Sequence, residues 1–403
     1  MKNKIAVYGV GVNCNILFDY GYLDGESDYD FYDKNKAGQT YRGKIVQSLE
    51  NLNSSSYDSI CVTPRDNESI VNWLCQEKNI DITKIKTAHE LNCEYVKKKL
   101  VERDSSVIFF DYPEADFFRY LFKDMFREKS VASMCLMREN GQWHTDKKIG
   151  GKKLFIFGGY DMVENYNNGF FEYLKDTYYE SKMVLVLWDK WDGIRGFKSY
   201  VPEYITPEWI KKTFDNYITY HNEDARKYGF HYYPQFYPCA KHSDLTETIS
   251  SDVLFVGNAK TPKRLELIHN IYKKLHKNGY KCRFIVIGVK EDDKLREFDI
   301  VYNNQPLKYQ EIVDEIKKTK TILEICVEGD ETSYRLSEAI IFNKKLIVND
   351  SHVVNSKYYK PENIQIYETA DDIDVEWLNK EMTDYEYDGQ LNTNVFIEYL
   401  QNQ

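Results

Sequence analysis

The part of the chain after residue 241 carries charged residues at two turns that could bind a phosphorylated ligand. Gly257 ends an apolar run, and the string NAKTPKRLELI leads from it into a predicted helix. Arg335 and Glu338 lie in the string EGDETSYRLSEAI, between an apolar strand and the next predicted helix. Backbone N–H groups at such a turn favour a phosphate, and an arginine can hold a diphosphate bidentately. A carboxylate one helical turn further on can accept hydrogen bonds from a ribose diol.

A second candidate site lies at the start of the chain. The string GVG at residues 9–11 follows an apolar strand, and Asp33 lies about 20 residues further on, which approximates the dinucleotide-binding fingerprint. Cys14 replaces the third glycine of that fingerprint, which packs the helix against the strand. We therefore expect no tight binding of NAD(H), and a structural, docking or regulatory role for this module. The string DYD at residues 28–30 matches a short metal–nucleotide pattern, and a strand edge is its simpler interpretation.

The elements that must position these residues alternate between β-branched strands and helices with one apolar face, which indicates parallel α/β sheets. Three domains are predicted, at residues 1–103, 104–240 and 241–403. The third contains six strand-like strings and corresponds to a complete doubly wound domain. An apolar face recurs at helical spacing in its first helix, at Leu265, Ile268, Ile271, Tyr272 and Leu275.

Composition and charge limit the classes of function. The chain has 403 residues and a formal net charge of −10, which argues against a nucleic-acid backbone as the main partner. Its eight cysteines form no CxxC pair, and several lie in apolar runs, so free thiols are expected rather than a disulfide frame or a zinc site. The string MKNKIAVYGVG enters a strand at once, which argues against a signal peptide. No stretch approaches the ~18 apolar residues of a membrane helix.

Four strings together resemble a known family. FVGNAKTPKRLEL and ETSYRLSEAIIFNKKLIVND are similar to the donor domain of GT-B glycosyltransferases, in particular the bacterial group that works on lipopolysaccharide, capsule or spore-coat glycans. VLVLWDKWDGI and FDNYITYHNEDARKYGFHYYPQFY resemble the acceptor-side domain of the same group. The resemblance covers residues 105–370 and implies two facing Rossmann-like domains, preceded here by a third, N-terminal one.

The resemblance assigns donor-binding roles by position. It implies that Glu338 holds the ribose, whereas a solvated helix residue is the simpler structural interpretation. For Arg335 the alternative to a diphosphate contact is an ion pair at the surface. The remaining donor-binding candidates are Gly257, Lys263, Arg264, Thr332 and Ser333.

This chain departs from the family pattern at two places. Asn343 occupies the position of a usual glycine, and Asp330 with Glu331 replaces a Gly-Leu pair. Asp330 and Glu338 have the spacing of two glutamates in related retaining enzymes, so inversion and retention both stay open.

The resemblance also implies where a catalytic base should lie. In an inverting enzyme it comes from the second domain, and it deprotonates the acceptor hydroxyl as the sugar gains oxocarbenium character. Asp189 ends a predicted strand, and Asp161 and Glu164 follow a glycine turn. Each of the three could instead cap a helix or fill a turn.

The leading hypothesis is therefore a cytoplasmic glycosyltransferase, of the hexosyltransferase class, with at most peripheral contact at the inner face of the membrane. Its partners would be a nucleotide-sugar donor and a glycan or glycolipid acceptor, with no nucleic acid, and no metal or other cofactor is required in principle. One alternative is an NAD(P)-dependent sugar oxidoreductase. Another is a non-catalytic assembly protein that binds nucleotide sugars.

Overall fold

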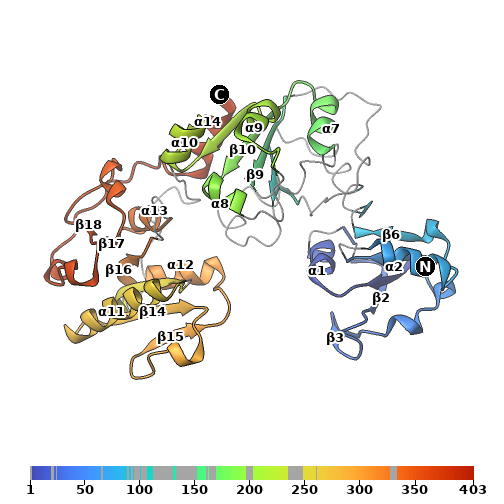
Figure 1. The fold of residues 1–403 in the computed structure, drawn as a ribbon, viewed down its shortest axis with the longest axis horizontal. Coiled ribbons are helices and arrows are strands. Elements are labelled where there is room, and N and C mark those ends of the chain that lie inside the picture. The colour runs from blue at the N-terminus through green and yellow to red at the C-terminus, as the bar shows by residue number, and fades with distance from the viewer. Residues whose placement is uncertain are drawn as a thin grey trace. The chain divides into compact units, whose positions relative to one another are not determined.

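A computed structural model gives the fold, whose helices and strands are labelled in Figure 1. The chain divides into two compact units. One unit comprises Met1–Ala115, Met125–Val186 and Ile194–Tyr217, and the other Asp116–Asp124, Leu187–Gly193 and Ile218–Gln403. Within the described residues, no helix has the length and apolar character needed to cross a bilayer. The structure describes residues 2–19, 22–23, 25–64, 67–88, 90–91, 94, 100, 107–111, 130–132, 152–159, 162, 169–196, 203–234, 248–259, 261–326 and 334–403.

The first sheet has four parallel strands in the order β2-β1-β5-β6. Successive side chains of a strand point to opposite faces, so Ala6 and Val7 of β1 enter two different cores. Val7 packs in the core that contains Cys14 of α1, and Ala6 in the core that contains Leu74 of α2. A short antiparallel hairpin, β3–β4, accompanies this sheet. The bounds are β1 Lys4–Tyr8, α1 Val12–Asp19, β2 Asp28–Tyr32, β3 Thr40–Tyr41, β4 Lys44–Ile45, β5 Ser59–Val62, α2 Glu68–Gln76 and β6 Ile85–Thr87.

The second sheet has six strands in the order β12-β11-β10-β9-β7-β8. Aromatic side chains form much of its core, and the rings of Phe110 and Phe157 stack with centroids 4.4 Å apart. The strand bounds are β7 Val107–Asp111, β8 Ser130–Ala132, β9 Leu154–Gly158, β10 Lys182–Leu187, β11 Asn216–Thr219 and β12 His231–Tyr232. The helix bounds are α7 Phe170–Thr177, α8 Trp191–Gly196, α9 Pro207–Thr213 and α10 Asn222–Tyr228.

The third sheet has six strands in the order β15-β14-β13-β16-β17-β18, and all five pairings are parallel. The chain builds outward from β13 in one direction and then from β16 in the other, which is the doubly wound order with a switch point between β13 and β16. All six predicted strands of this domain are present. The bounds are β13 Ser251–Asn258, α11 Pro262–Lys277, β14 Cys282–Ile287, β15 Ile300–Asn303, α12 Tyr309–Lys317, β16 Thr319–Glu324, α13 Tyr334–Ile341, β17 Lys345–Val348 and β18 Ile364–Ile366.

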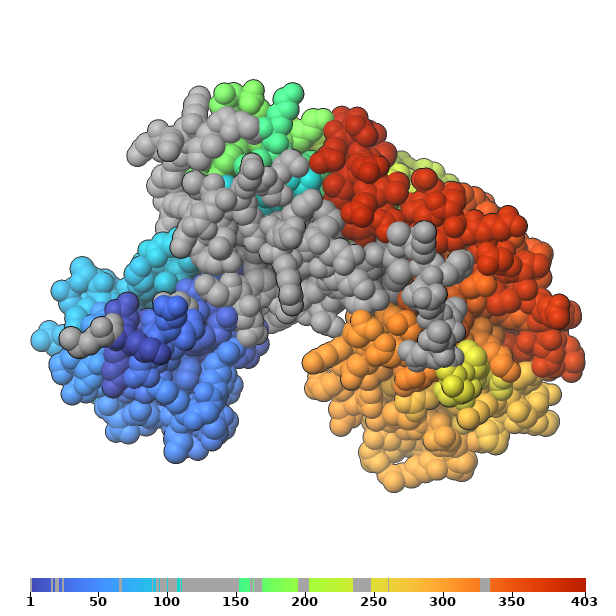
Figure 2. Space-filling view, turned by 180° about the vertical axis from the view of Figure 1, so that it is seen from behind, coloured from blue at the N-terminus to red at the C-terminus, as the bar shows by residue number. Residues whose placement is uncertain are grey.

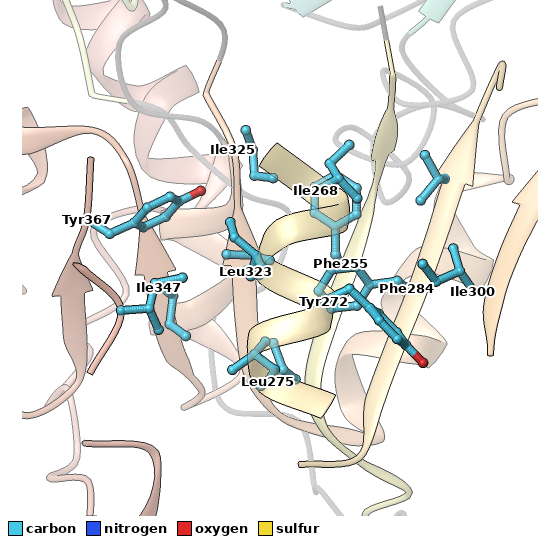
Figure 3. Close-up of a cluster of buried hydrophobic side chains, with 14 of the residues drawn as sticks. Phe255, Ile268, Tyr272, Leu275, Phe284, Ile300, Leu323, Ile325, Ile347 and Tyr367 are labelled. Atoms are coloured by element: carbon cyan, nitrogen blue, oxygen red, sulfur yellow. The ribbon is translucent and has the colours of Figure 1, made fainter. Parts of the chain in front are cut away.

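Helix α11 supplies one side of the core of this sheet. Thr261 caps its first turn by accepting from the Arg264 N–H at 3.2 Å, and a proline follows at the first helical position, where its missing N–H is no loss. The predicted apolar face is buried, apart from Leu265, which is half-buried. Figure 3 shows Ile268, Tyr272 and Leu275 of α11 against strand side chains such as Phe255 and Phe284.

These three sheets confirm the predicted α/β class with parallel, Rossmann-like sheets. Each sheet lies inside one of the predicted domain ranges, although the two compact units do not follow those ranges. The C-terminal helix α14 (Thr393–Asn402) packs on the predicted second domain, because the Tyr233 ring lies 4.9 Å from that of Phe396 and 4.7 Å from that of Tyr399. Figure 1 shows α14 beside α10, and Figure 2 shows the C-terminal segment in red as an exposed band.

The end of α13 explains one departure from the family pattern. Asn343, which replaces the usual glycine, has φ of 48° and so adopts the left-handed conformation. The Lys344 N–H then donates to the Ala339 carbonyl at 2.8 Å, which closes the helix and turns the chain into β17. Glycine adopts this conformation without a steric cost, and asparagine tolerates it better than most residues.

Five cysteines lie in the described residues, and all five are free thiols. Cys14 and Cys61 are buried in the same core of the first domain. Burial raises the pKa of the Cys61 thiol above its ordinary value, so this group stays protonated near neutral pH.

Candidate functional site

The switch point of the third sheet gathers the predicted donor-binding residues that the structure describes. Gly257 lies near the end of β13, and Glu324 is the last residue of β16. In doubly wound sheets ligands bind outside the carboxyl ends of the strands at such a point, because the loops from neighbouring strands diverge there. A Cβ atom built on Gly257 would lie 2.8 Å from the Phe255 ring and 3.5 Å from the Arg264 guanidinium, so only glycine fits without a shift.

Arg335 joins the two strands of the switch point. Its guanidinium donates to the Val256 carbonyl of β13 at 3.3 Å and lies 3.6 Å from the Glu324 carboxylate of β16. It also forms an ion pair with Glu338, one helical turn further along α13. Burial lowers the pKa of the guanidinium, but the two carboxylates outweigh it and raise that pKa above its ordinary value. Arg335 is therefore a cation with a side chain 13% exposed and three protein partners, so the ion pair considered for it is present, although most of the side chain is shielded from solvent.

Glu338 is completely buried, with an exposed side-chain fraction of 0%. One carboxylate oxygen accepts from the Tyr309 hydroxyl at the start of α12, and the other accepts from Arg335. The solvated helix residue considered for Glu338 is therefore wrong. A ribose can reach this carboxylate only if the chain that covers it moves aside, so ribose binding by Glu338 stays a prediction.

The first turn of α11 contributes a second cation. The Nε atom of Arg264 is buried and has no hydrogen-bond partner among the described residues, whereas Lys263 is exposed. Asn258, at the end of β13, likewise has a buried side-chain oxygen that lacks a partner in the described part of the chain. An unsatisfied buried guanidinium nitrogen costs free energy, and an anion at this edge would remove that cost.

The sequence analysis missed Glu324 and Tyr309. Glu324 is a charged residue inside the apolar string TILEICV, which is a signal in itself, because a carboxylate in a buried parallel strand needs a partner. No local signal identifies Tyr309, because its contact with Glu338 joins α12 to α13.

Asp189 follows β10 and is exposed. Burial, and then the negative charge of Asp189, raise the pKa of the Tyr334 hydroxyl well above its ordinary value. Asp189 therefore lies within electrostatic reach of the first residue of α13, next to Arg335. The other predicted site residues, Asp161, Glu164, Thr332 and Ser333, lie outside the described residues.

In the N-terminal glycine turn, side chains of the same module occupy the backbone groups that a dinucleotide would need. Gly9 has φ of 94°, and a Cβ atom there would lie 2.6 Å from Pro64, so glycine is required. The Asp33 carboxylate, which would hold a ribose in a dinucleotide site, accepts from the Val10 N–H at 2.9 Å. Lys36 donates to the Val10 carbonyl at 2.5 Å. Both backbone groups of Val10 are thus satisfied within the module.

No group of three or more acidic, histidine or cysteine side chains in the described residues could hold a metal ion. In the DYD string, Asp28 and Asp30 lie 2.6 Å and 3.4 Å from the Lys44 ammonium group. Tyr57 also donates to Asp30 at 2.9 Å. These carboxylates form ion pairs at the strand edge.

No family model matches the chain, and no curated protein matches it. Among solved structures, the Gap123 glycosylation-associated complex of Streptococcus agalactiae is similar at 11% identity and a TM-score of 0.39, over 64% of this chain and 54% of that one. The chain thus spans about half of the Gap123 chain. A DNA-modifying β-glucosyltransferase is similar at 9% identity and a TM-score of 0.33, with coverage of 99% and 95%. The S. aureus MnaA–UDP co-structure is similar at 12% identity and a TM-score of 0.38, with coverage of 100% and 97%. Likenesses at these scores assign no role to any residue here.

Proposed function

We propose that the chain is a glycosyltransferase of the GT-B type. It would transfer a sugar, a hexose by preference, from a nucleotide diphosphate to a hydroxyl group of a surface glycan or glycolipid. The observation that supports this most is an exposed acid, Asp189, whose negative charge acts on Tyr334, the first residue of the helix that carries Arg335 and Glu338. This arrangement combines a base with an anion-binding edge.

The diphosphate of the donor would bind at the first turn of α11. The Arg264 guanidinium and the N–H groups of this turn create a positive electrostatic potential. This potential would stabilise the negative charge that develops on the diphosphate as it leaves. Lys263 would add a donor there, and Thr332 and Ser333 stay donor-binding candidates from the resemblance alone. Glu338 would accept from the ribose once the covering chain has moved, while Arg335 holds the two central strands together.

Asp189 would act as the general base of an inverting reaction. Its carboxylate takes the proton of the acceptor hydroxyl while the acceptor oxygen bonds to the anomeric carbon and the bond from that carbon to the diphosphate breaks. Asp161 and Glu164 stay alternative candidates for the same role.

The test compares Asp189→Asn with Asp192→Asn. Asp192 lies three residues further on, in the first turn of α8, and is paired with Lys227 at 2.9 Å and with Tyr228 at 2.7 Å, so it serves as a matched control. We expect Asp189→Asn to lower the transfer rate about 10²- to 10⁴-fold and to leave nucleotide diphosphate affinity unchanged. Asp192→Asn should transfer like the wild type. A wild-type transfer rate in Asp189→Asn would show that Asp189 is not the general base.

A thermal-shift panel of UDP, GDP, CDP and dTDP, with NADH and NADPH beside them, tests the donor class. Stabilisation by one of the four diphosphates is the expected result. Stabilisation by NADH alone would instead favour an oxidoreductase. Binding of a nucleotide sugar with neither transfer nor donor hydrolysis would favour the non-catalytic assembly protein.

A further inference from the structure

The loop that carries Asp189 is held on both sides by the first turn of α10. The Trp191 N–H donates to the Asp224 carboxylate at 2.7 Å, and the His221 Nε2 atom lies 3.3 Å from the Trp188 carbonyl. His221 and Asp224 are 6% and 3% exposed, so both contacts are shielded from water. The Trp188 carbonyl directly precedes Asp189, and the Trp191 N–H follows it after Lys190, so the two anchored backbone groups lie on either side of Asp189.

The charged residues that follow Asp189, Lys190 of the loop and Asp192 of α8, are also bound to α10. Lys190 pairs with Glu223 at 3.1 Å, and Asp192 pairs with Lys227 at 2.9 Å. For Asp189 the described residues provide no hydrogen bond or ion pair. The loop is thus fixed around an acid that is left open to solvent.

The chemistry of His221 sets its protonation at this contact. A carbonyl oxygen can only accept, so the Nε2 atom that faces Trp188 must carry the proton. The Nδ1 atom is buried and has no hydrogen-bond partner among the described residues. Burial raises the pKa of the Asp224 carboxyl, and among the smaller opposing effects is that of His221, which therefore lies near this carboxylate. Burying an imidazole with one unsatisfied nitrogen next to a buried acid costs folding free energy, and apolar packing would hold the loop at a smaller cost.

We propose that His221 and Asp224 are positioning residues that hold the backbone on each side of Asp189, so that its carboxylate faces the acceptor hydroxyl. This rests on the proposed function and extends it to two buried residues that the sequence did not single out. A displacement of about 1 Å of a reacting group can lower a rate about 100-fold, so the effect of losing either anchor should fall on kcat.

The test uses truncating and conservative variants at each position. Asp224→Ala removes the acceptor for Trp191, whereas Asp224→Asn keeps an oxygen there. His221→Phe removes the donor to Trp188, whereas His221→Gln keeps an N–H close to the position of Nε2. The matched control is Glu223→Gln, because its ion pair lies at an exposed position of the same turn, where such pairs contribute little.

We expect Asp224→Ala and His221→Phe to lower kcat about 10- to 100-fold with the donor KM within about threefold of the wild type. Asp224→Asn and His221→Gln should restore kcat to within about threefold, and Glu223→Gln should match the wild type. If Asp224→Ala fails to fold, His221→Phe, which preserves volume, gives the same readout. Unchanged kcat in the truncating variants, or equal losses in the conservative ones, would overturn the positioning role.

Asp189→Asn separates this result from the proposed function. If Asp189→Asn lowers transfer as expected while His221→Phe and Asp224→Ala leave kcat unchanged, the assignment of the base stands and the positioning role is wrong. If Asp189→Asn transfers normally, the assignment of the base is wrong, and the positioning role is wrong with it.

Discussion

Arg335 and Glu338 form an ion pair one helical turn apart on α13, and the Glu338 side chain is completely buried in it. A second carboxylate, Glu324, lies 3.6 Å from the same guanidinium. The pair therefore couples α13 to both strands of the switch point, because Arg335 also reaches the Val256 carbonyl of β13. Its integrity should matter for stability as well as for ligand binding.

Glu338→Ala should destabilise the protein by about 1.5–3 kcal/mol for each hydrogen bond lost, because it removes the carboxylate to which both Arg335 and the Tyr309 hydroxyl donate. The sequence alone predicts a variant that stays folded and only binds nucleotide more weakly, and the burial of Glu338 changes that expectation. Glu338→Gln keeps the volume and one acceptor, so it should lose less. Urea denaturation followed by circular dichroism measures both. Equal stability of Glu338→Ala and the wild type would contradict a stabilising role of the contacts that Glu338 makes with Arg335 and Tyr309.

Arg264→Ala should weaken the binding of nucleotide diphosphates about 10- to 100-fold, since hydrogen bonds to charged groups contribute about 1.5–3 kcal/mol. Affinity for the free nucleoside should not change, because the guanidinium would contact only phosphate. Lys263→Ala, at the exposed neighbouring position, is the control and should have a smaller effect. Calorimetry with nucleoside, monophosphate and diphosphate measures each variant. Parallel losses for all three ligands would place Arg264 outside the phosphate site.

Asn343→Ala should destabilise the protein by about 1–2 kcal/mol relative to Asn343→Gly, because alanine is strained in the left-handed conformation and glycine is not. The glycine variant should be at least as stable as the wild type. Thermal unfolding of the wild type and the two variants at one pH gives the order of their stabilities. An alanine variant as stable as the glycine variant would mean that this turn is not left-handed.

The free energy of unfolding of Asp224→Asn, relative to that of the wild type, should increase as the pH rises. Burial raises the pKa of the Asp224 carboxyl above its ordinary value, although the Trp191 N–H partly opposes this. Between the ordinary value of about 3.9 and the raised one, the folded state binds more protons than the unfolded state, so the free energy of unfolding falls with rising pH. The contribution is complete below that ordinary value and is lost as the pH passes through the raised one.

Asparagine does not titrate, so the difference in unfolding free energy between Asp224→Asn and the wild type should grow with pH and then level off. Urea denaturation of both proteins from pH 4 to pH 7 measures it. A difference that stays constant, or that shrinks with rising pH, would contradict the raised pKa.

NADH should not bind tightly to the N-terminal module, because Asp33 is engaged with the Val10 N–H and Cys14 replaces the third glycine of the fingerprint. Calorimetry should give a dissociation constant well above the micromolar range. Restoring the glycine with Cys14→Gly should not create a site while Asp33 still closes the turn. A micromolar constant for the wild-type protein would refute this.

The hydrophobic periodicity of the sequence was sufficient to predict the strands and helices of the third domain. Buried parallel strands need short apolar runs, and helices between them need one apolar face, so strings such as KCRFIVIG and the face of α11 identify these elements locally. The glycine turn at Gly9 is equally local, because its left-handed φ excludes other residues. Gly257 and Arg264 could be paired in advance, since both belong to one strand–turn–helix unit.

Only the tertiary structure decided which charges are open to a ligand. Arg335, Glu338 and Asp189 look alike in the sequence, as polar residues near the ends of predicted elements. Glu338 is buried and Arg335 is 13% exposed, and they bind Tyr309 and Glu324 of separate elements, whereas Asp189 is exposed and has no hydrogen bond or ion pair within the described residues. Hydrogen bonds and ion pairs between distant segments depend on how strands are ordered in a sheet, and a one-dimensional pattern carries no information about that order. For the same reason His221 and Asp224 could not be singled out before their contacts with the loop of Asp189 were seen.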